Sequence, residues 1–499
     1  MQTPPAVDAI RGRLPRAVKH YEDDTDCVTI TLQPESLVAA CEALRDDPLL
    51  RYDALSVLAY ADRHLIYQLV STSLPERLRL RVPVRDDPPG IESTAFVWPA
   101  ARWAEQEIRD HWHVDFAGHP NPAPLFRGPA SPRDPPEHDL GGMRFPTSLD
   151  GLTFAVDATP QGGNTVTPLL GRRHVALGRQ LCQVPYQACT SLLARVDGFS
   201  AHVGDLAYAT AVESLLQVTP PPRAQVLRTI YAECARIASH LYWLARMTQN
   251  HAPPAYVAPA RAWQARQRAL DLMAQWGHGS PVPDAICIGG LVWDAPDDLQ
   301  DTLTDWSAEM SAHLDKLEAL IYRPRWIDRQ LGDQGVIDPG TAVGLGVTGP
   351  NLRACGLPYD VRTAFPYARY PALDVPVRVQ SEGDARSRFL LRLAEVRASL
   401  EIVRQAEDHL QPGPVRALED GDLPDTLPVG TVYAAVEGPR GEWGILLVSQ
   451  GQANWQSVQI RGPSFANLSA LPYLCRNAQP DHLVAILDSL DISAGEVER

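Results

Sequence analysis

The feature that most constrains this chain is a proline-rich segment about a quarter of the way along it. Seven prolines lie between His119 and Gly142, in a stretch with few residues able to build a core. Proline fixes φ and removes a backbone donor, so this stretch should form an extended, semi-rigid connector. The 499 residues are also too many for one ordinary domain. We therefore expect a small domain at residues 1–120, a linker at 121–148 and a large domain at 149–499.

The two expected domains differ in their pattern of apolar residues. In the small domain the pattern predicts helices at 34–45 and 100–111 and strands at 28–32, 63–70 and 78–84. The large domain shows three- and four-residue spacing, most clearly over about seven helical turns that begin at Pro222. Further helices are expected at 205–218, 260–276, 301–322 and 384–409, and strands at 431–436, 443–449 and 457–461. The fold class is therefore α+β, with a small α+β domain followed by a large, mainly helical domain that has a small β portion.

Charge and composition exclude several classes of function. The formal net charge of −15 argues against a protein that tracks nucleic-acid phosphates. No apolar run approaches the roughly 18 residues of a membrane span, and the first ten residues lack the apolar segment of a secretory signal. The eight cysteines include no C-x-x-C pair, so zinc-ribbon and iron–sulfur ligand spacings are missing. We expect a cytoplasmic protein that reaches a membrane only through partners.

Residues 103–120 carry a specific motif, WAEQEIRDHWHVDFAGHP. It resembles the signature W-x-E-R-E-x-x-D-x-x-G-x-x-F-x-G-H-P of the C subunit of complex I, the NADH:quinone oxidoreductase. The central glycine of that signature is His113 here. The resemblance implies a docking and packing element, a helix followed by a tight turn, and no catalytic role.

The large domain resembles the D subunit of complex I, which shares its fold with the large subunit of [NiFe] hydrogenases. The resemblance covers roughly residues 165–499 and lies in an ordered series of stretches. These are 195–197, 207–213, 220–225, 233–241, 289–294, 348–367, 383–395 and 495–499. The chain as a whole therefore resembles a fused C/D subunit.

The positions of the hydrogenase metal ligands are informative because nickel and iron need four soft thiolates there. The four positions align on Asp197, Ser200, Ser493 and Glu496, so all thiolates are absent and we expect no nickel. Two carboxylates and two hydroxyls could form a weak site for a hard cation. A hydrogen-bonded polar plug in a vestigial cavity is the interpretation we favour, because buried polar groups generally find partners.

The quinone-site positions implied by the resemblance to the D subunit have changed as well. Arg195 and Asp197 match the family motif R-x-D-Y, but its tyrosine is Gly198. The family loop H-P-S-T-H-G is missing, and residues 157–164 read DATPQGGN instead. The aspartate behind the quinone histidine falls on Asn250, whereas His174 matches the histidine of the L-H-R-G-T-E-K-L segment. Glycine and asparagine cannot donate the protons that quinone reduction needs, so bound quinone is not expected from these positions.

In the shared fold the segments around 195–200 and 493–496 come together. We therefore expect Asp197 and Glu496 to lie close to each other, in an ion-pair cluster centred on Arg195, to which His174 adds positive charge. This cluster should fill the space of a quinone headgroup or metal. The resemblance alternatively implies that Arg195 faces the terminal iron–sulfur cluster of a partner protein.

The leading hypothesis is a fused C/D subunit in the peripheral arm of a complex I-like assembly, on the cytoplasmic face of the inner membrane. The resemblance implies an iron–sulfur partner similar to the B subunit of complex I, together with membrane-arm subunits. It implies that this chain binds no cofactor and that another subunit binds the NAD. The alternative is a non-catalytic scaffold that docks a soluble module onto an antiporter-like membrane arm. A free-standing enzyme is disfavoured, since the sequence shows no nucleophile–base pair and no metal constellation.

Overall fold

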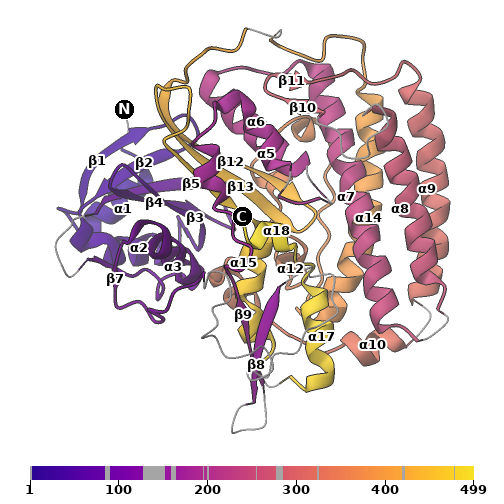
Figure 1. The fold of residues 1–499 in the computed structure, drawn as a ribbon, viewed down its shortest axis with the longest axis horizontal. Coiled ribbons are helices and arrows are strands. Elements are labelled where there is room, and N and C mark those ends of the chain that lie inside the picture. The colour runs from indigo at the N-terminus through magenta and orange to yellow at the C-terminus, as the bar shows by residue number, and fades with distance from the viewer. Residues whose placement is uncertain are drawn as a thin grey trace.

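The computed structural model describes residues 3–84, 90–126, 152–158, 164–194, 196–198, 200, 202–253, 256–276, 285–322, 325–418, 422–476 and 478–499. A small domain with a β-sheet lies beside a larger, mainly helical domain (Figure 1). The predicted α+β class is confirmed. Most of the predicted linker lies outside the described residues, so its boundaries at 121 and 148 stay a prediction.

The small domain is built on a five-stranded sheet with the order β1-β2-β5-β4-β3. Only the β2–β5 pair is parallel. The strands are β1 (Val18–Asp23), β2 (Val28–Leu32), β3 (Ala54–Ala61), β4 (His64–Val70) and β5 (Arg77–Pro83), and β6 (Ile91–Glu92) pairs with β7 (Phe116–Ala117). The helices are α1 (Pro5–Arg13), the 3-10 turn η1 (Pro34–Ser36), α2 (Leu37–Asp46) and α3 (Ala101–Trp112). Apolar residues of α1 and α2 form one core with β2, β4 and β5.

The motif that resembles the C subunit forms α3 and the turn that follows it. His113, at the position of the family glycine, ends the helix in the left-handed region with φ 56°. Glu105 is buried in the middle of the motif. It accepts hydrogen bonds from Ser93 Oγ at 2.5 Å and from the Thr94 backbone amide at 2.7 Å. The motif therefore holds the preceding loop in place, which is a packing role.

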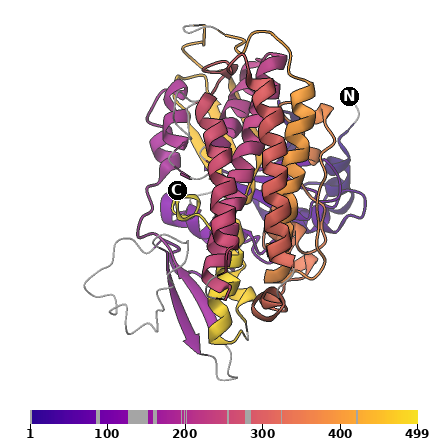
Figure 2. The ribbon, with the colours of Figure 1, turned by 90° about the vertical axis from the view of Figure 1, so that its right-hand side faces the viewer.

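Four long helices form the main layer of the large domain and run side by side (Figure 2). They are α7 (Pro222–His251), α8 (Ala258–Trp276), α9 (Leu299–Tyr322) and α14 (Ala385–Asp408). Helix α7 packs on α8 and α14, and α9 closes the bundle against the same two helices. No helix among the described residues is both long and apolar enough to cross a membrane.

The C-terminal hairpin has the expected position and a tight turn. Strand β12 (Val429–Gly438) pairs with β13 (Gly441–Gln450), which pairs with β14 (Ser457–Arg461). Gly438 and Gly441 face each other, so Pro439 and Arg440 are the two residues at the tip. A Cβ added to Gly349 would lie 2.3 Å from the Gly441 Cα, so the hairpin tip lies directly against the backbone of residues 348–350.

Shorter elements connect and cover these two parts. In the first half of the large domain they are β8 (Thr153–Ala158), β9 (Asn164–Leu169), α4 (Leu177–Leu181), η2 (Tyr186–Ala188), α5 (Thr190–Leu193) and α6 (His202–Leu216). Around the bundle they are β10 (Ile286–Cys287), β11 (Gly290–Leu291), α10 (Trp326–Leu331), α11 (Pro339–Gly344), α12 (Pro350–Arg353), α13 (Val361–Ala364) and η3 (Tyr370–Ala372). After the hairpin come α15 (Pro463–Ser469), α16 (Leu471–Leu474), α17 (Pro480–Ser489) and α18 (Ala494–Val497).

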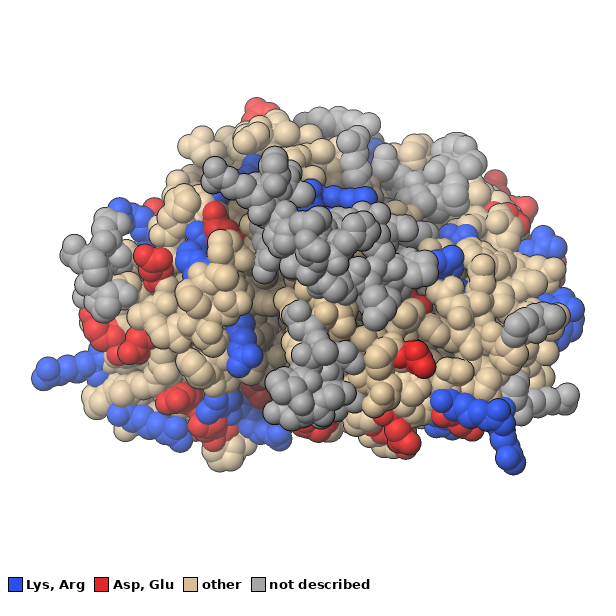
Figure 3. Space-filling view, turned by 60° about the horizontal axis from the view of Figure 1, so that its bottom comes forward, with Lys and Arg blue, Asp and Glu red and all other residues tan. Residues whose placement is uncertain are grey.

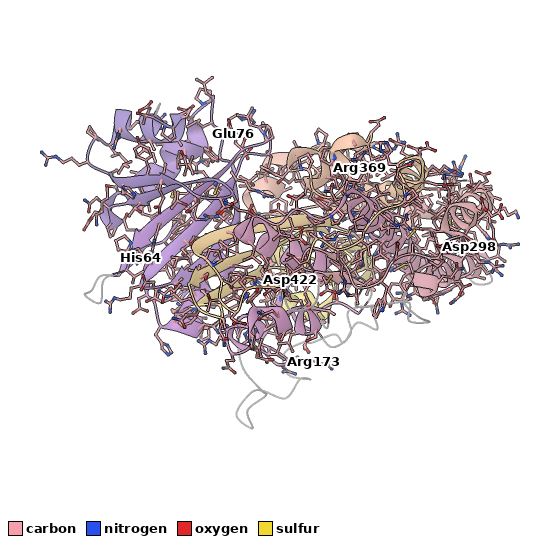
Figure 4. All side chains as sticks on the ribbon, turned by 90° about the horizontal axis from the view of Figure 1, so that it is seen from above. His64, Glu76, Arg173, Asp298, Arg369 and Asp422 are labelled. Carbon is pink, nitrogen blue, oxygen red and sulfur yellow. The ribbon has the colours of Figure 1, made fainter. Side chains whose placement is uncertain are left out.

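Strands β3 and β4 of the small domain's sheet are buried on both faces, whereas the edge strand β1 has no buried residue. Val57 and Ala59 of β3 and Ile66 of β4 belong to the core of the large domain. Polar contacts reinforce this interface: Arg461 donates to the Ser56 carbonyl at 2.5 Å, and the Tyr433 amide donates to Asp26 at 3.0 Å. Figure 4 shows the two domains side by side, with His64 in the small domain and Asp298 at the far end of the helical one.

Candidate functional site

Buried ion pairs cross the interior between α7, α14 and the β12–β13 hairpin. Arg353 lies 2.9 Å from Glu395, 2.8 Å from Glu437 and 3.3 Å from Asp360. Arg362 binds Asp360 at 2.6 Å and Glu233 at 3.0 Å. Burial alone would raise the pKa of Glu233, but Arg236 and Arg362 lower it to about 2. These residues therefore hold the helices together as charged pairs.

The segments around Val196 and Ser493 meet in the structure. Ser493 donates its hydroxyl to Asp197 Oδ1 at 3.3 Å. A Cβ added to Gly495 would lie 1.9 Å from the Val196 carbonyl oxygen, so the two backbones are in direct contact. The structure therefore brings Asp197 and Ser493 together and places Glu496, one helical turn on, next to the same segment.

The arginine of this cluster is Arg440, from the hairpin tip. Arg440 Nη1 donates to Asp197 Oδ2 at 2.5 Å, and Arg440 Nε lies 3.4 Å from Asp491 Oδ1. All three side chains are at least 95% buried. The expected centre of the cluster, Arg195, lies outside the described residues, so the pairing predicted for it stays a prediction.

Glu496 is buried beside this cluster. Its Oε2 accepts the Ser464 backbone amide at 3.0 Å and a short hydrogen bond from the Ser464 hydroxyl. Burial raises the pKa of Glu496 to about 7; Arg440 opposes this rise, and the neighbouring charge of Asp197 adds to it. Glu496 therefore exchanges its proton close to neutral pH.

Among the described residues, the ion pairs leave space next to Gly198. A cavity of about 530 Å³ lies there, lined by Asp197, Gly198, Arg440, Asp491 and Ser493 among others. A Cβ built on Gly198 meets no atom of the described residues within 4 Å. Because Arg195 lies outside the described residues, the expectation that an ion-pair cluster fills this cavity stays a prediction. Arg173, labelled in Figure 4, also lines this cavity.

The other residues singled out in the sequence lie in different surroundings. Ser200 is buried, and its hydroxyl has no hydrogen-bond partner among the described residues. Asn250 donates to Asp488 Oδ2 at 3.1 Å, which is also 2.9 Å from His251 Nε2. Asn250 therefore links the C-terminal end of α7 to Asp488 of α17. Of the altered loop at 157–164, only the backbone of its end residues 157, 158 and 164 is described.

His174 lies at the interface between the two domains and apart from the Asp197 cluster. Its Nε2 is 3.0 Å from Nε2 of His111, and its ring stacks on Phe126 with centroids 4.0 Å apart. Burial lowers the pKa of His174 to about 4, and His111 lowers it further as a second potential cation. At neutral pH His174 is uncharged and adds no positive charge to the cluster.

Among the residues that the structure describes, no group of three or more His, Cys, Asp or Glu side chains has the arrangement of a metal site. The hard-cation interpretation required Asp197 to be available to a metal. Its carboxylate instead binds the guanidinium of Arg440. What the arrangement offers chemically is hydrogen bonding: Arg440 and Ser493 donate, and Asp491 accepts.

Sequence reasoning does not reveal three residues of this cavity. For Arg440 the sequence indicates only a turn, although Gly438 and Gly441 around it allow close packing. Asp491 adopts a left-handed φ of 56°, which no sequence pattern reveals. Tyr242 lines the cavity from α7. It lies in a long helix with many apolar residues, where the pattern alone indicates a core tyrosine.

Comparisons with known proteins agree with the two-part resemblance. The family model "Respiratory-chain NADH dehydrogenase, 30 Kd subunit" matches residues 30–140. The family model "Respiratory-chain NADH dehydrogenase, 49 Kd subunit" matches residues 256–426 and 422–499. The second NADH-quinone oxidoreductase D subunit of Chloroflexus aurantiacus is 33% identical over 398 residues, covering 74% of this chain and 93% of that protein. The corresponding D subunit of Thermus thermophilus is 34% identical over 385 residues, covering 72% and 93%.

Proposed function

The chain belongs to the family of NADH-quinone oxidoreductase D subunits, with a C-type domain in the same polypeptide, and we propose that it works in the peripheral arm of a complex I-like assembly. Its neighbours there are a B-type iron–sulfur protein and membrane-arm subunits on the cytoplasmic face of the inner membrane. The relatives' name supplies the reaction class, electron transfer from NADH to quinone.

The observation that carries this proposal is the meeting of residues 196–198 with 493–496 beside a cavity. Asp197, Ser493 and Arg440 form its polar wall, and leucine, valine and isoleucine side chains form much of the rest. Gly198 and Asn250 replace the tyrosine and aspartate of the family, so the usual proton donors are absent from those positions. The chain therefore acts next to an electron-transfer step carried out by its partner's cluster.

The second candidate is a non-catalytic scaffold, which the same two substitutions favour. Asn250 is hydrogen-bonded to Asp488 and contributes nothing to the cavity wall described above. In this case the chain docks an iron–sulfur protein onto a membrane arm without handling quinone. Neither candidate needs a basic surface: on the face in Figure 3, basic and acidic side chains alternate over both domains.

The test is to purify the assembly from its native membranes through a tag on this chain. We expect a stoichiometric B-type iron–sulfur protein and an electron paramagnetic resonance signal on reduction by NADH. An Arg195→Gln variant should lower the midpoint potential of the terminal cluster, because a nearby positive charge favours the reduced state. Arg378→Gln, an exposed arginine paired with Glu401, is the matched control.

One outcome would contradict both candidates, and another would discriminate between them. A tagged chain that purifies without any iron–sulfur partner would contradict both. An assembly whose cluster is reduced by NADH, but which never passes electrons to added menadione, would support the scaffold.

A further inference from the structure

A cleft with a volume of about 1420 Å³ lies between the small domain and the large domain. The small domain contributes the end of α2, the start of α3 and the turn after β4, and the large domain contributes residues between 339 and 345, 357 and 364, and 469 and 476. The Ala100 amide donates to the Gly344 carbonyl at 2.9 Å, so the two walls are joined by a backbone hydrogen bond. Small-molecule sites usually measure about 300–1,000 Å³. This interdomain cleft is therefore large enough for a segment of polypeptide.

Arginines determine the charge of the interdomain cleft. Arg51, Arg102 and Arg476 line it and are exposed, and none of them forms an ion pair within the described part of the chain. A fourth arginine of the lining, Arg45, lies 2.7 Å from Asp46. The whole chain has a formal net charge of −15. The cleft therefore concentrates positive charge on an acidic protein, and such a cleft attracts a ligand of opposite charge.

The carboxylates of the cleft wall do not neutralise these arginines. Among the described lining residues only Asp53 and Asp360 are acidic. Asp53 accepts hydrogen bonds from the Thr72 amide at 2.9 Å and from the Thr72 hydroxyl at 2.8 Å. Asp360 is fully buried and lies 2.6 Å from Arg362. Both carboxylates are engaged within the wall, so the carboxylates that pair with the exposed arginines have to come from a ligand.

Two large apolar side chains are exposed beside the cleft. Leu49 is 80% exposed and Phe96 is 70% exposed. Leu49 lies two residues before Arg51, and Phe96 precedes Val97, which also lines the cleft. Arg45 Nη1 donates to the Val97 carbonyl at 3.1 Å, so the two segments adjoin. Large apolar side chains exposed in adjoining segments favour a protein-binding surface.

We propose that the interdomain cleft binds an acidic peptide segment of a partner protein. Its carboxylates pair with the guanidiniums of Arg51, Arg102 and Arg476, a geometry in which two parallel hydrogen bonds can form. Its apolar side chains cover Leu49 and Phe96. The chain's own segment 127–151 contains four acidic residues and three arginines, so its net charge is close to zero and charge complementarity favours a partner. The inference goes beyond the proposed function, which assigns no ligand to this cleft.

The experiment measures fluorescence anisotropy of a fluorescein-labelled peptide titrated with the full-length chain. The probe is a twelve-residue peptide in which pairs of glutamates alternate with single leucines, and the control peptide has glutamine in place of every glutamate. We expect saturable binding of the glutamate peptide and at least about tenfold weaker binding of the glutamine peptide. Raising the salt concentration should weaken binding of the glutamate peptide, because salt screens exposed charges.

Substitution of the three arginines tests the charged contacts. Arg51→Gln, Arg102→Gln and Arg476→Gln should each weaken binding of the glutamate peptide about two- to fivefold, the range for one exposed ion pair. The triple variant should weaken it at least about tenfold. Arg329→Gln is the matched control, because Arg329 is an exposed arginine of α10 without an ion pair in the described part of the chain. It should bind as the wild type does.

A second pair of variants tests the apolar contacts. Leu49→Ser combined with Phe96→Ser should weaken binding at least about fivefold, because two apolar side chains no longer leave water on binding. Val429→Ser is the control, since Val429 is 75% exposed at the start of β12, and it should leave binding unchanged. Circular dichroism verifies that each variant is folded.

Several results would overturn the inference. One is the absence of saturable binding by the wild-type chain, which is also expected if its own segment 127–151 occupies the cleft. Others are equal affinity for the two peptides, unchanged affinity in the triple arginine variant or in the double serine variant, and an equal loss in Arg329→Gln. An oligothymidylate of similar charge that binds as tightly as the glutamate peptide would indicate unspecific attraction of anions. A chain that purifies with its iron–sulfur partner but binds no acidic peptide refutes this inference and leaves the proposed function standing.

Discussion

The interior between α7 and α14 and the cavity at Gly198 use the same residue types in different ways. In the interior, Arg353 contacts three carboxylates and Arg362 contacts two. In the cavity wall, Arg440 contacts Asp197 and Asp491, but among the described residues its Nε and one oxygen of Asp491 stay without a hydrogen bond. Arg353 Nη2 in the interior likewise has no hydrogen-bond partner among the described residues. The two regions therefore differ in their surroundings: the first is enclosed by packed helices, whereas the second borders a cavity of about 530 Å³.

This difference separates structural charge from charge that can serve a ligand. Buried ion pairs with all partners present add specificity to packing but contribute little net stability. Buried groups with missing partners lower stability, and a ligand can recover that loss. Four changes test whether the two regions behave in this way.

The largest effect is expected in the interior. Arg353→Leu should lower the free energy of unfolding by about 3–5 kcal/mol, because three buried carboxylates lose their guanidinium. Chemical denaturation measures it. Arg378→Leu, which breaks an exposed pair, should cost less than about 1 kcal/mol. Equal losses in the two variants would mean that water reaches the interior and that the contrast between the regions is false.

The second effect appears as a pH dependence at Glu496. The folded-state pKa of about 7 exceeds the usual 4.5, so the folded state keeps a proton that the unfolded state has lost. Stability should therefore fall as pH rises from 4.5 to 7, by roughly 3 kcal/mol for this group alone. Glu496→Gln should remove that slope in urea unfolding at several pH values. An identical slope in the variant would assign the effect to another group.

The third test compares two glycines of the cavity wall. Gly495→Ala should destabilise the protein by about 2–3 kcal/mol, because the new Cβ meets the Val196 carbonyl oxygen. Gly198→Ala should change stability by no more than about 1 kcal/mol and in the stabilising direction, since its Cβ meets no atom of the described part of the chain within 4 Å. Thermal unfolding measures both. A large loss in Gly198→Ala would show that the space beside it is not open.

The smallest effect concerns the domain interface. The pKa of His174 falls from 6.5 to about 4, so on acidification the unfolded state takes up the proton first. The stability that neutral His174 contributes is complete above pH 6.5 and should be lost as pH falls to 4. After allowance for partial exposure this is about 1–2 kcal/mol. His174→Gln should flatten the acid limb of the stability curve, and His20→Gln, an exposed change, should leave it intact.

Much of the fold could be predicted because its elements show clear periodicity. Strands β2 and β14 have the predicted bounds, and α9 begins two residues before the predicted start. Strand β3 is not evident from the sequence. The first six of its eight residues are all buried, so the strand lacks the alternation of a half-exposed strand. Such a strand is recognised only once its second partner, here the large domain, is known.

The site was predicted less completely, for a physical reason. The meeting of Asp197 with Ser493 follows from the shared fold, which the resemblance supplies. Arg440, Asp491 and Tyr242 reach the cavity from a turn, a left-handed residue and a helix that are distant in sequence. Their convergence depends on tertiary geometry, and no local pattern encodes it.

Because β3 and β4 of the small domain pack against the large domain, the covalent link between the domains affects how strongly they associate. Both domains belong to one polypeptide, so the contacts of β3 with the large domain are intramolecular, and covalently linked binding modules have effective concentrations of the order of millimolar. Two separate chains at micromolar levels would need an interface tighter by about 4 kcal/mol to be equally associated. Loss of one contact, such as the hydrogen bond from Arg461 to the Ser56 carbonyl, should therefore dissociate a larger fraction of two separate chains than of two domains in one chain.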